Sequence, residues 1–176
     1  MIYKLRKFVP ISTLRLVYYS LFQSTLQYSL INWGRACKTH IQKIRILQNR
    51  FIRACLFSNY SSTNSLYYRF CVLKLDDLID MEFAKFMFKF YNKLLPRTFD
   101  NYFTDLNYIH KYNTRQKIRN VFFQHHSKTE NGKRRLHHKC LTVWKKISPQ
   151  FRTYSFGKFK QELRKEYISK YNTFTQ

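Results

Sequence analysis

The sequence predicts a mainly α-helical fold, and three observations support that prediction. Apolar residues recur every three or four positions along several segments, as they do on the buried face of a helix. Only three glycines and three prolines are present, fewer than a turn-rich all-β fold needs. Apolar residues make up 44% of the 176 positions, enough to bury a core. We therefore expect a helical bundle followed by a small basic C-terminal region of α or α+β structure.

Two helical stretches are expected before Gly34. Ser12 follows Pro10 and is placed to cap the first helix. The expected apolar positions of this helix share a helical spacing: Leu14, Val17, Tyr18, Leu21 and Phe22. The second stretch is predicted over residues 26–33, and Gly34 is expected to close it.

A regular helical pattern follows over residues 39–55. Thr39 and Gln42 have the spacing of a capping box, in which each side chain bonds the backbone N–H of the other residue. The apolar side chains expected on one face are Ile41, Ile44, Leu47, Phe51 and Cys55. The opposite face is expected to carry Arg45, Asn49 and Arg53.

A short helix and a long helix are predicted next. Ser65 follows a polar loop and is placed to cap a short helix that runs to Phe70. The long helix is predicted over residues 76–95, where Pro96 stops it. Its apolar stripe consists of Ile79, Phe83, Phe86, Phe90 and Leu94. Acids in its first turns and lysines further along suit the helix dipole.

Composition divides the chain into three parts. Residues 1–96 form a helical domain, residues 97–110 an aromatic-rich connection, and residues 111–176 a basic domain with seventeen Lys or Arg and three acids. Within the basic domain, the pair Asn131-Gly132 is expected to turn the chain between two strands or two helices. A final helix is predicted over residues 155–168.

The formal net charge of +24 points to a polyanionic partner. The chain has 33 Lys and Arg against nine Asp and Glu, and phosphate backbones bind such surfaces with release of counterions. Its 14 Tyr, 17 Phe and 2 Trp are far more aromatics than a disordered basic tail carries. The shortage of acids disfavours metal-dependent phosphoryl chemistry. We therefore expect a folded protein that binds RNA, DNA or an RNA–DNA hybrid.

Cysteine usage and hydropathy indicate an intracellular protein. The four cysteines are widely spaced and are expected to be free, buried thiols in the nucleus or cytoplasm: Cys37, Cys55, Cys71 and Cys140. The first residues lead to Pro10 rather than to an apolar leader segment. Residues 14–33 are apolar-rich but contain polar side chains that a spanning helix rarely tolerates, so no membrane partner is expected.

Cations interleaved with aromatic residues are the candidate contacts to nucleic acid, because cations reach phosphates and flat rings stack on bases. The helix predicted over residues 39–55 supplies three of them, Arg45, Arg50 and Arg53. The basic domain supplies the others: Tyr112, Arg115, Lys117, Arg119, Lys133, Arg134, Arg135, Trp144, Lys145 and Lys146. Tyr112 and Trp144 are expected to support the cations or to stack on bases.

One acid pair offers an alternative function. Asp76 and Asp77 are the only adjacent acids, so a small metal-dependent nuclease or polymerase would depend on them. The pair opens a predicted helix, however, where acids are favoured for electrostatic reasons alone. We therefore expect no catalytic residue. A basic membrane-surface or scaffold module is a further alternative.

Histidines and a cysteine in the basic domain offer zinc ligands. They form the patterns His125-His126 and His137-His138-x-Cys140. Imidazole and thiolate are the ligands that zinc prefers, but this spacing matches no standard zinc site. We expect histidines on a basic surface and no metal site.

Short motifs along nearly the whole chain occur in the order found in one family of polymerases. The motifs lie at residues 14–22, 28, 32–34, 44–54, 73–75, 86–90, 94–96, 112–115, 144–149, 155 and 159–160. In this order the chain resembles the region after the palm in reverse transcriptases of jockey-type non-LTR retrotransposons. Residues 47–53 are similar to that family's L-Q-K-R-A-I-R stretch, and residues 112–115 to its Y-N-T-R signature. Departures are Ser24, where a proline is common, Lys145, where asparagine is common, and Ser148 before Pro149.

The resemblance implies a thumb-like domain and C-terminal region that grip RNA template and DNA primer beside a polymerase site located elsewhere. The family's aromatic-Ala-Asp-Asp catalytic turn is missing from the sequence. The chain is therefore expected to be a fragment that is not an enzyme on its own and needs no cofactor, since Mg²⁺ belongs to the palm of the resembled polymerase. An intact reverse transcriptase acting in trans is a further expected partner.

Overall fold

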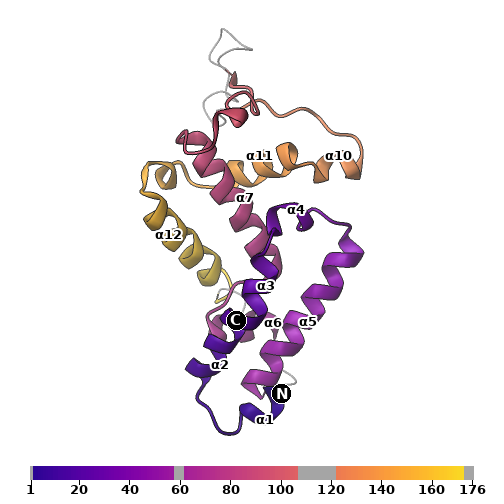
Figure 1. The fold of residues 1–176 in the computed structure, drawn as a ribbon, viewed down its shortest axis with the longest axis vertical. Coiled ribbons are helices and arrows are strands. Elements are labelled where there is room, and N and C mark those ends of the chain that lie inside the picture. The colour runs from indigo at the N-terminus through magenta and orange to yellow at the C-terminus, as the bar shows by residue number, and fades with distance from the viewer. Residues whose placement is uncertain (1, 58–61, 107–121, 173–176) are drawn as a thin grey trace. The chain divides into compact units, whose positions relative to one another are not determined.

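The structure, a computed structural model, describes residues 2–57, 62–106 and 122–172. Every named element within these residues is a helix, which confirms the prediction of a mainly α fold (Figure 1). The β pairing of the described residues is one isolated antiparallel bridge between Asp105 and Phe122.

Packing divides the chain into two compact units. Unit 1 contains Met1–Ile79 and Gln161–Gln176, and unit 2 contains Asp80–Lys160. Helix α7 (Leu75–Tyr91) begins in unit 1 and ends in unit 2. Helix α12 (Phe156–Ser169) begins in unit 2 and ends in unit 1. Compact units therefore do not follow the compositional boundaries at residues 96 and 111, because the end of α12 packs with the N-terminal helices.

Unit 1 is built from one long helix, α5 (Lys38–Leu56), and several short helices around a core that contains several aromatic rings. Its remaining elements are α1 (Ile2–Leu5), α2 (Ile11–Val17), the π-helix η1 (Tyr18–Gln23), α3 (Ser24–Gln27), α4 (Leu30–Trp33) and α6 (Thr63–Phe70). Tyr18 is fully buried, and other aromatic rings of unit 1 surround it. Its ring centroid is 5.4 Å from those of Phe22 and Phe51 and 5.8 Å from that of Phe70.

The first helical stretch is longer than predicted, and the second is shorter. Helices α2, η1 and α3 follow one another without a gap, and the first begins after Pro10 with no side-chain cap, so the prediction that Ser12 caps it is wrong. The predicted helix over 26–33 is interrupted at Ser29, whose φ of 52° is left-handed. Leu21 is exposed rather than buried.

Gly34 closes α4 as predicted, but the position needs glycine because of close packing and not because of its backbone conformation. Its φ of −61° is open to any residue. A Cβ at this position would lie 2.6 Å from the carbonyl oxygen of Leu30 and 3.1 Å from the side chain of Ile79. Glycine is therefore required because the backbone approaches its neighbours too closely for a side chain.

Helix α5 buries part of the predicted face, since Ile41 and Cys55 are buried as predicted. It begins at Lys38 without a side-chain cap, so the predicted capping box is absent. Among its buried side chains are Gln48, Ile52 and Cys55, whereas the predicted core residue Leu47 is 53% exposed. In the middle of the helix the buried positions are Gln48 and Ile52, each one residue after a predicted core position, so a glutamine lies in the core.

The ends of α6 and α7 differ from their predicted positions. The side chain of Ser62 caps α6 by accepting from the N–H of Ser65, so the cap lies three residues earlier than predicted. Helix α7 ends at Tyr91, and Lys93 adopts a left-handed φ of 55°. The N–H of Leu94 then donates to the carbonyl of Lys89 at 2.8 Å, which is the usual bond of a left-handed helix end. Pro96 is not what stops the helix.

Unit 2 surrounds the second half of α7 with aromatic residues. Its further elements are the 3₁₀ helix η2 (Arg97–Phe99), α10 (Glu130–Arg134), α11 (Leu136–Lys146), the 3₁₀ helix η3 (Pro149–Thr153) and the start of α12. Phe88 stacks on Phe159 with ring centroids 4.4 Å apart, and Phe90 meets Phe103 at 4.7 Å. The pair Asn131-Gly132 lies inside α10, so the predicted turn at this position is wrong.

The final helix is confirmed as α12, within which Phe159 and Leu163 are buried. None of the four cysteines, all of which the structure describes, is in a disulfide, but Cys37 and Cys71 are exposed at helix ends, so the prediction that they are buried is wrong. Within the described residues, no helix combines the length and apolar character needed to span a membrane.

Candidate nucleic-acid interface

The outward face of α5 carries exposed cations. The helix contains five Lys or Arg and no Asp or Glu. Lys38, Lys43 and Arg50 are exposed. Lys43 and Arg50 are seven positions apart, so they project from the same face about 10 Å apart along the axis. An acid-free helix with cations on its outward face can contact successive phosphates of a backbone.

The three arginines predicted on this helix have different environments. Arg50 is exposed, and Arg53 is half-buried. Arg45 is held by Asp76, whose two carboxylate oxygens accept from Nε at 3.0 Å and from Nη2 at 2.7 Å. Its Nη1 donates to the side chain of Gln42. Arg45 therefore links α5 to the start of α7, and Arg50 is the member of the three best placed to meet a phosphate.

The adjacent acids Asp76 and Asp77 both have structural partners. They lie in the first turn of α7, which confirms the predicted helix-opening position. Asp76 pairs with Arg45, and Asp77 accepts a hydrogen bond from the hydroxyl of Tyr171. In the part of the chain that the structure describes, no three His, Cys, Asp or Glu side chains are grouped to hold a metal ion.

A buried polar network surrounds this helix start. The hydroxyl of Tyr171 accepts from the backbone N–H of Lys74 at 3.1 Å, and the Lys74 ammonium lies 4.6 Å from the centroid of the Tyr171 ring. Burial raises the pKa of Tyr171, and the neighbouring Asp77 raises it further. Burial also lowers the pKa of Lys74, against the opposing effect of Asp77 and Asp76. The network anchors the C-terminal end of α12 in unit 1.

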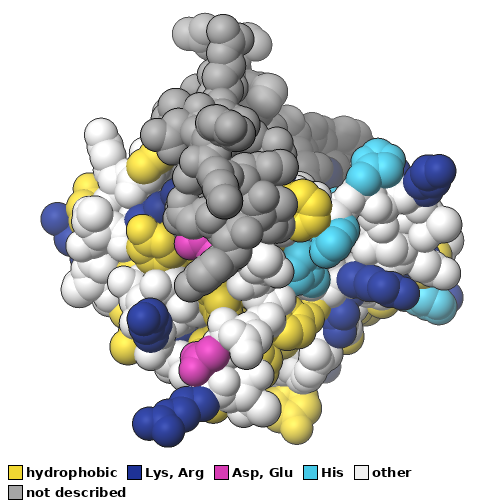
Figure 2. All heavy atoms as spheres, turned by 90° about the horizontal axis from the view of Figure 1, so that it is seen from above, with side chains coloured by type: hydrophobic (Ala, Val, Ile, Leu, Met, Phe, Trp, Pro, Cys, Tyr) yellow, Lys and Arg dark blue, Asp and Glu magenta, His cyan; other side chains and the backbone are white. Residues whose placement is uncertain are grey.

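Helices α10 and α11 present a second basic surface, in unit 2. Lys133 pairs with Glu130 at 3.0 Å, and Arg134 donates to the Glu130 carbonyl at 3.3 Å. Arg135 is exposed between the two helices. Figure 2 shows Lys, Arg and His side chains side by side on part of the face that it draws, with few acidic side chains.

The two lysines at the end of α11 make weak surface contacts. Lys145 donates to the Gln124 side chain at 2.5 Å, and the Lys146 ammonium lies 3.7 Å from Asp80. Exposed ion pairs contribute at most about 1 kcal/mol. A phosphate can therefore replace the present partners of these lysines at little cost.

Trp144 does not belong to this surface. Its side chain is only 3% exposed, and its ring centroid is 5.7 Å from that of Tyr91. The guanidinium of Arg152 lies 5.0 Å from the centroid of the indole ring. The expectation that Trp144 stacks on bases does not fit this buried position, because the covered indole ring leaves no face open to a base.

The histidines of unit 2 are associated with aromatic rings. His137 stacks on Phe103 with ring centroids 4.9 Å apart, and the rings of His125 and His137 are 6.2 Å apart. Burial lowers the pKa of His137, and His125 and His138 lower it further. Cys140 is buried in α11.

Four predicted contact residues lie outside the residues that the structure describes: Tyr112, Arg115, Lys117 and Arg119. Sequence reasoning overlooked Lys38 and Lys43, although the seven-residue spacing from Lys43 to Arg50 was a usable signal.

Comparison of the chain with protein-family models, curated proteins and solved structures finds no match.

Proposed function

We propose that the chain binds the phosphate backbone of RNA, DNA or an RNA–DNA hybrid. The observation that carries the proposal is the outward face of α5, where exposed Lys43 and Arg50 lie on a helix without acids. The basic surface of α10 and α11 supports it. In the reverse transcriptases that the motifs resemble, the corresponding region would grip template and primer beside the palm.

The proposed contacts act through charge. Each phosphate that a Lys or Arg neutralises releases condensed counterions, so affinity falls steeply as salt rises. Such contacts carry no base information and hold strands of any sequence. The proposed activity is binding without turnover, and Asp76 and Asp77 have the structural role of holding Arg45 and Tyr171.

Fluorescence anisotropy with a labelled RNA–DNA hybrid across a salt series tests the proposal. The double variant Lys43→Glu, Arg50→Glu is expected to bind at least about tenfold more weakly, and its log affinity against log salt to be flatter by about two. The matched control is Lys4→Glu, Lys7→Glu, which makes the same change in net charge at exposed positions near α1.

The control variant is expected to retain most of the affinity. Equal losses in both variants would show that net charge, rather than the face of α5, determines binding. Absence of binding at low salt by the folded wild-type chain would refute the proposed function.

A further inference from the structure

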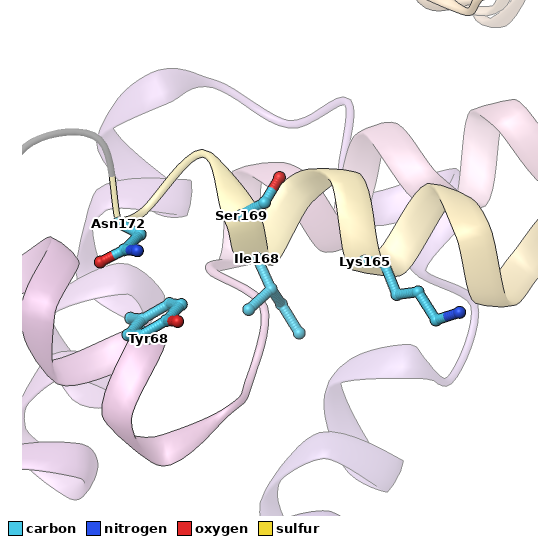
Figure 3. A pocket seen from close by; sticks show the side chains of 5 residues that line it. All are labelled: Tyr68, Lys165, Ile168, Ser169 and Asn172. Atoms are coloured by element: carbon cyan, nitrogen blue, oxygen red, sulfur yellow. The ribbon is translucent and has the colours of Figure 1, made fainter.

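A shallow groove of about 250 Å³ lies in unit 1 between α6 and the end of α12 (Figure 3). Its lining residues are Tyr68, Lys165, Ile168, Ser169 and Asn172. Pockets for whole drug-sized ligands start at about 300 Å³. This groove therefore suits one flat ring system rather than a larger molecule.

Tyr68 offers an aromatic surface on the groove. Its side chain is 42% exposed. Among the described residues no ring stacks on it and no cation lies over it, whereas the neighbouring Tyr67 meets Tyr171 at 6.3 Å. Figure 3 shows Ile168 and Asn172 turned toward the Tyr68 ring. A ring that enters the groove would contact an aromatic face and an aliphatic side chain together.

One cation, Lys165, lines the groove. The side chain of Lys165 is 72% exposed and pairs with Glu162 one turn earlier on α12, at 2.8 Å. This exposed pair is weak, so the ammonium can exchange its partner for a phosphate. In Figure 3 Lys165 extends away from Tyr68, along α12. A negatively charged group attached to the bound ring would meet a cation outside the groove.

We propose that this groove binds one nucleotide of a single-stranded nucleic acid, with the base on the Tyr68 ring against Ile168 and a phosphate near Lys165. The inference rests on the proposed function and adds a base contact to the backbone contacts of α5. Every base has a flat face, so stacking of this kind tolerates any sequence.

The test compares a labelled oligothymidylate with an abasic strand of the same length and charge. Stacking of one base strengthens binding by about tenfold or more. The wild-type chain is therefore expected to prefer the base-bearing strand by about tenfold. Tyr68→Ala should remove the preference without changing the salt dependence, and Tyr68→Phe should retain it because the ring remains. Tyr28→Ala is the matched control, since Tyr28 is exposed and lies outside the groove.

Three results would overturn the inference, and they are distinguishable. Equal binding of both strands by the wild-type chain would exclude a base-stacking site while leaving backbone binding intact. A preference that survives Tyr68→Ala, in a variant with wild-type helix content, would place the stacking elsewhere. Absence of binding to either strand by a chain that binds the RNA–DNA hybrid would exclude this groove alone, whereas absence of binding to the hybrid as well would remove the proposed function and this inference together.

Discussion

Replacement of Gln48 tests the polar centre of unit 1. The side chain is fully buried, and its amide joins three segments. Nε2 donates to the Tyr18 hydroxyl at 2.8 Å and to the Leu73 carbonyl at 2.9 Å, and Oε1 accepts from the N–H of Leu75 at 2.9 Å. Gln48→Leu keeps a side chain of similar size and removes all three bonds.

The expected loss follows from the groups left without a partner. Leu75 is the first residue of α7, where a backbone N–H has no intrahelical acceptor. A buried polar group deprived of its partner costs about 1–3 kcal/mol. Three such groups outweigh the gain of about 1.5–3 kcal/mol from burying a leucine. We expect the free energy of unfolding to fall by about 3 kcal/mol, a large part of the total for a small protein.

Urea unfolding followed by circular dichroism measures this loss. The matched control is Gln42→Leu on the same helix, where the side chain is exposed and bonds only Arg45 among the contacts described above. Its unfolding free energy should stay within about 0.5 kcal/mol of the wild-type value. If Gln48→Leu were as stable as this control, the three bonds would contribute nothing and the reasoning would be refuted.

Two further predictions concern stability. Trp144→Ala should lower the free energy of unfolding by about 3–5 kcal/mol because it empties a core position, and an unchanged melting temperature would place the side chain at the surface. Burial raises the pKa of Cys55 from 9.0 to about 11 and that of Tyr18 from 10.0 to about 12, so the folded state retains these protons at higher pH than the unfolded state. The stability that these two groups contribute should therefore be fully present below pH 9.0 and be lost progressively up to about pH 12, with a shallower decline in Tyr18→Phe; urea midpoints that do not vary with pH would contradict this.

Local pattern predicted the helices but not their ends. Helical spacing and charge are properties of neighbouring residues, so the mainly α fold, α12 and the opening of α7 at its acids could all be predicted. A left-handed residue at a helix end is usually glycine, but the chain has only three glycines. Helices α5 and α6 end at Phe57 and Cys71, which adopt the left-handed conformation in place of a glycine. No residue preference marks those positions.

The sequence alone determined the helical class, the basic character and the set of candidate cations. Only the tertiary structure decided which face of α5 is buried and which cations remain exposed. Gln48 is in the core because its partners Tyr18 and Leu73 are 30 and 25 residues away, and Arg45 is held by Asp76, 31 residues away. Trp144 is in the core because Tyr91 and Arg152 cover it. Apart from the contact between Trp144 and Arg152, these contacts join residues far apart in the chain, and no local periodicity or composition carries that information.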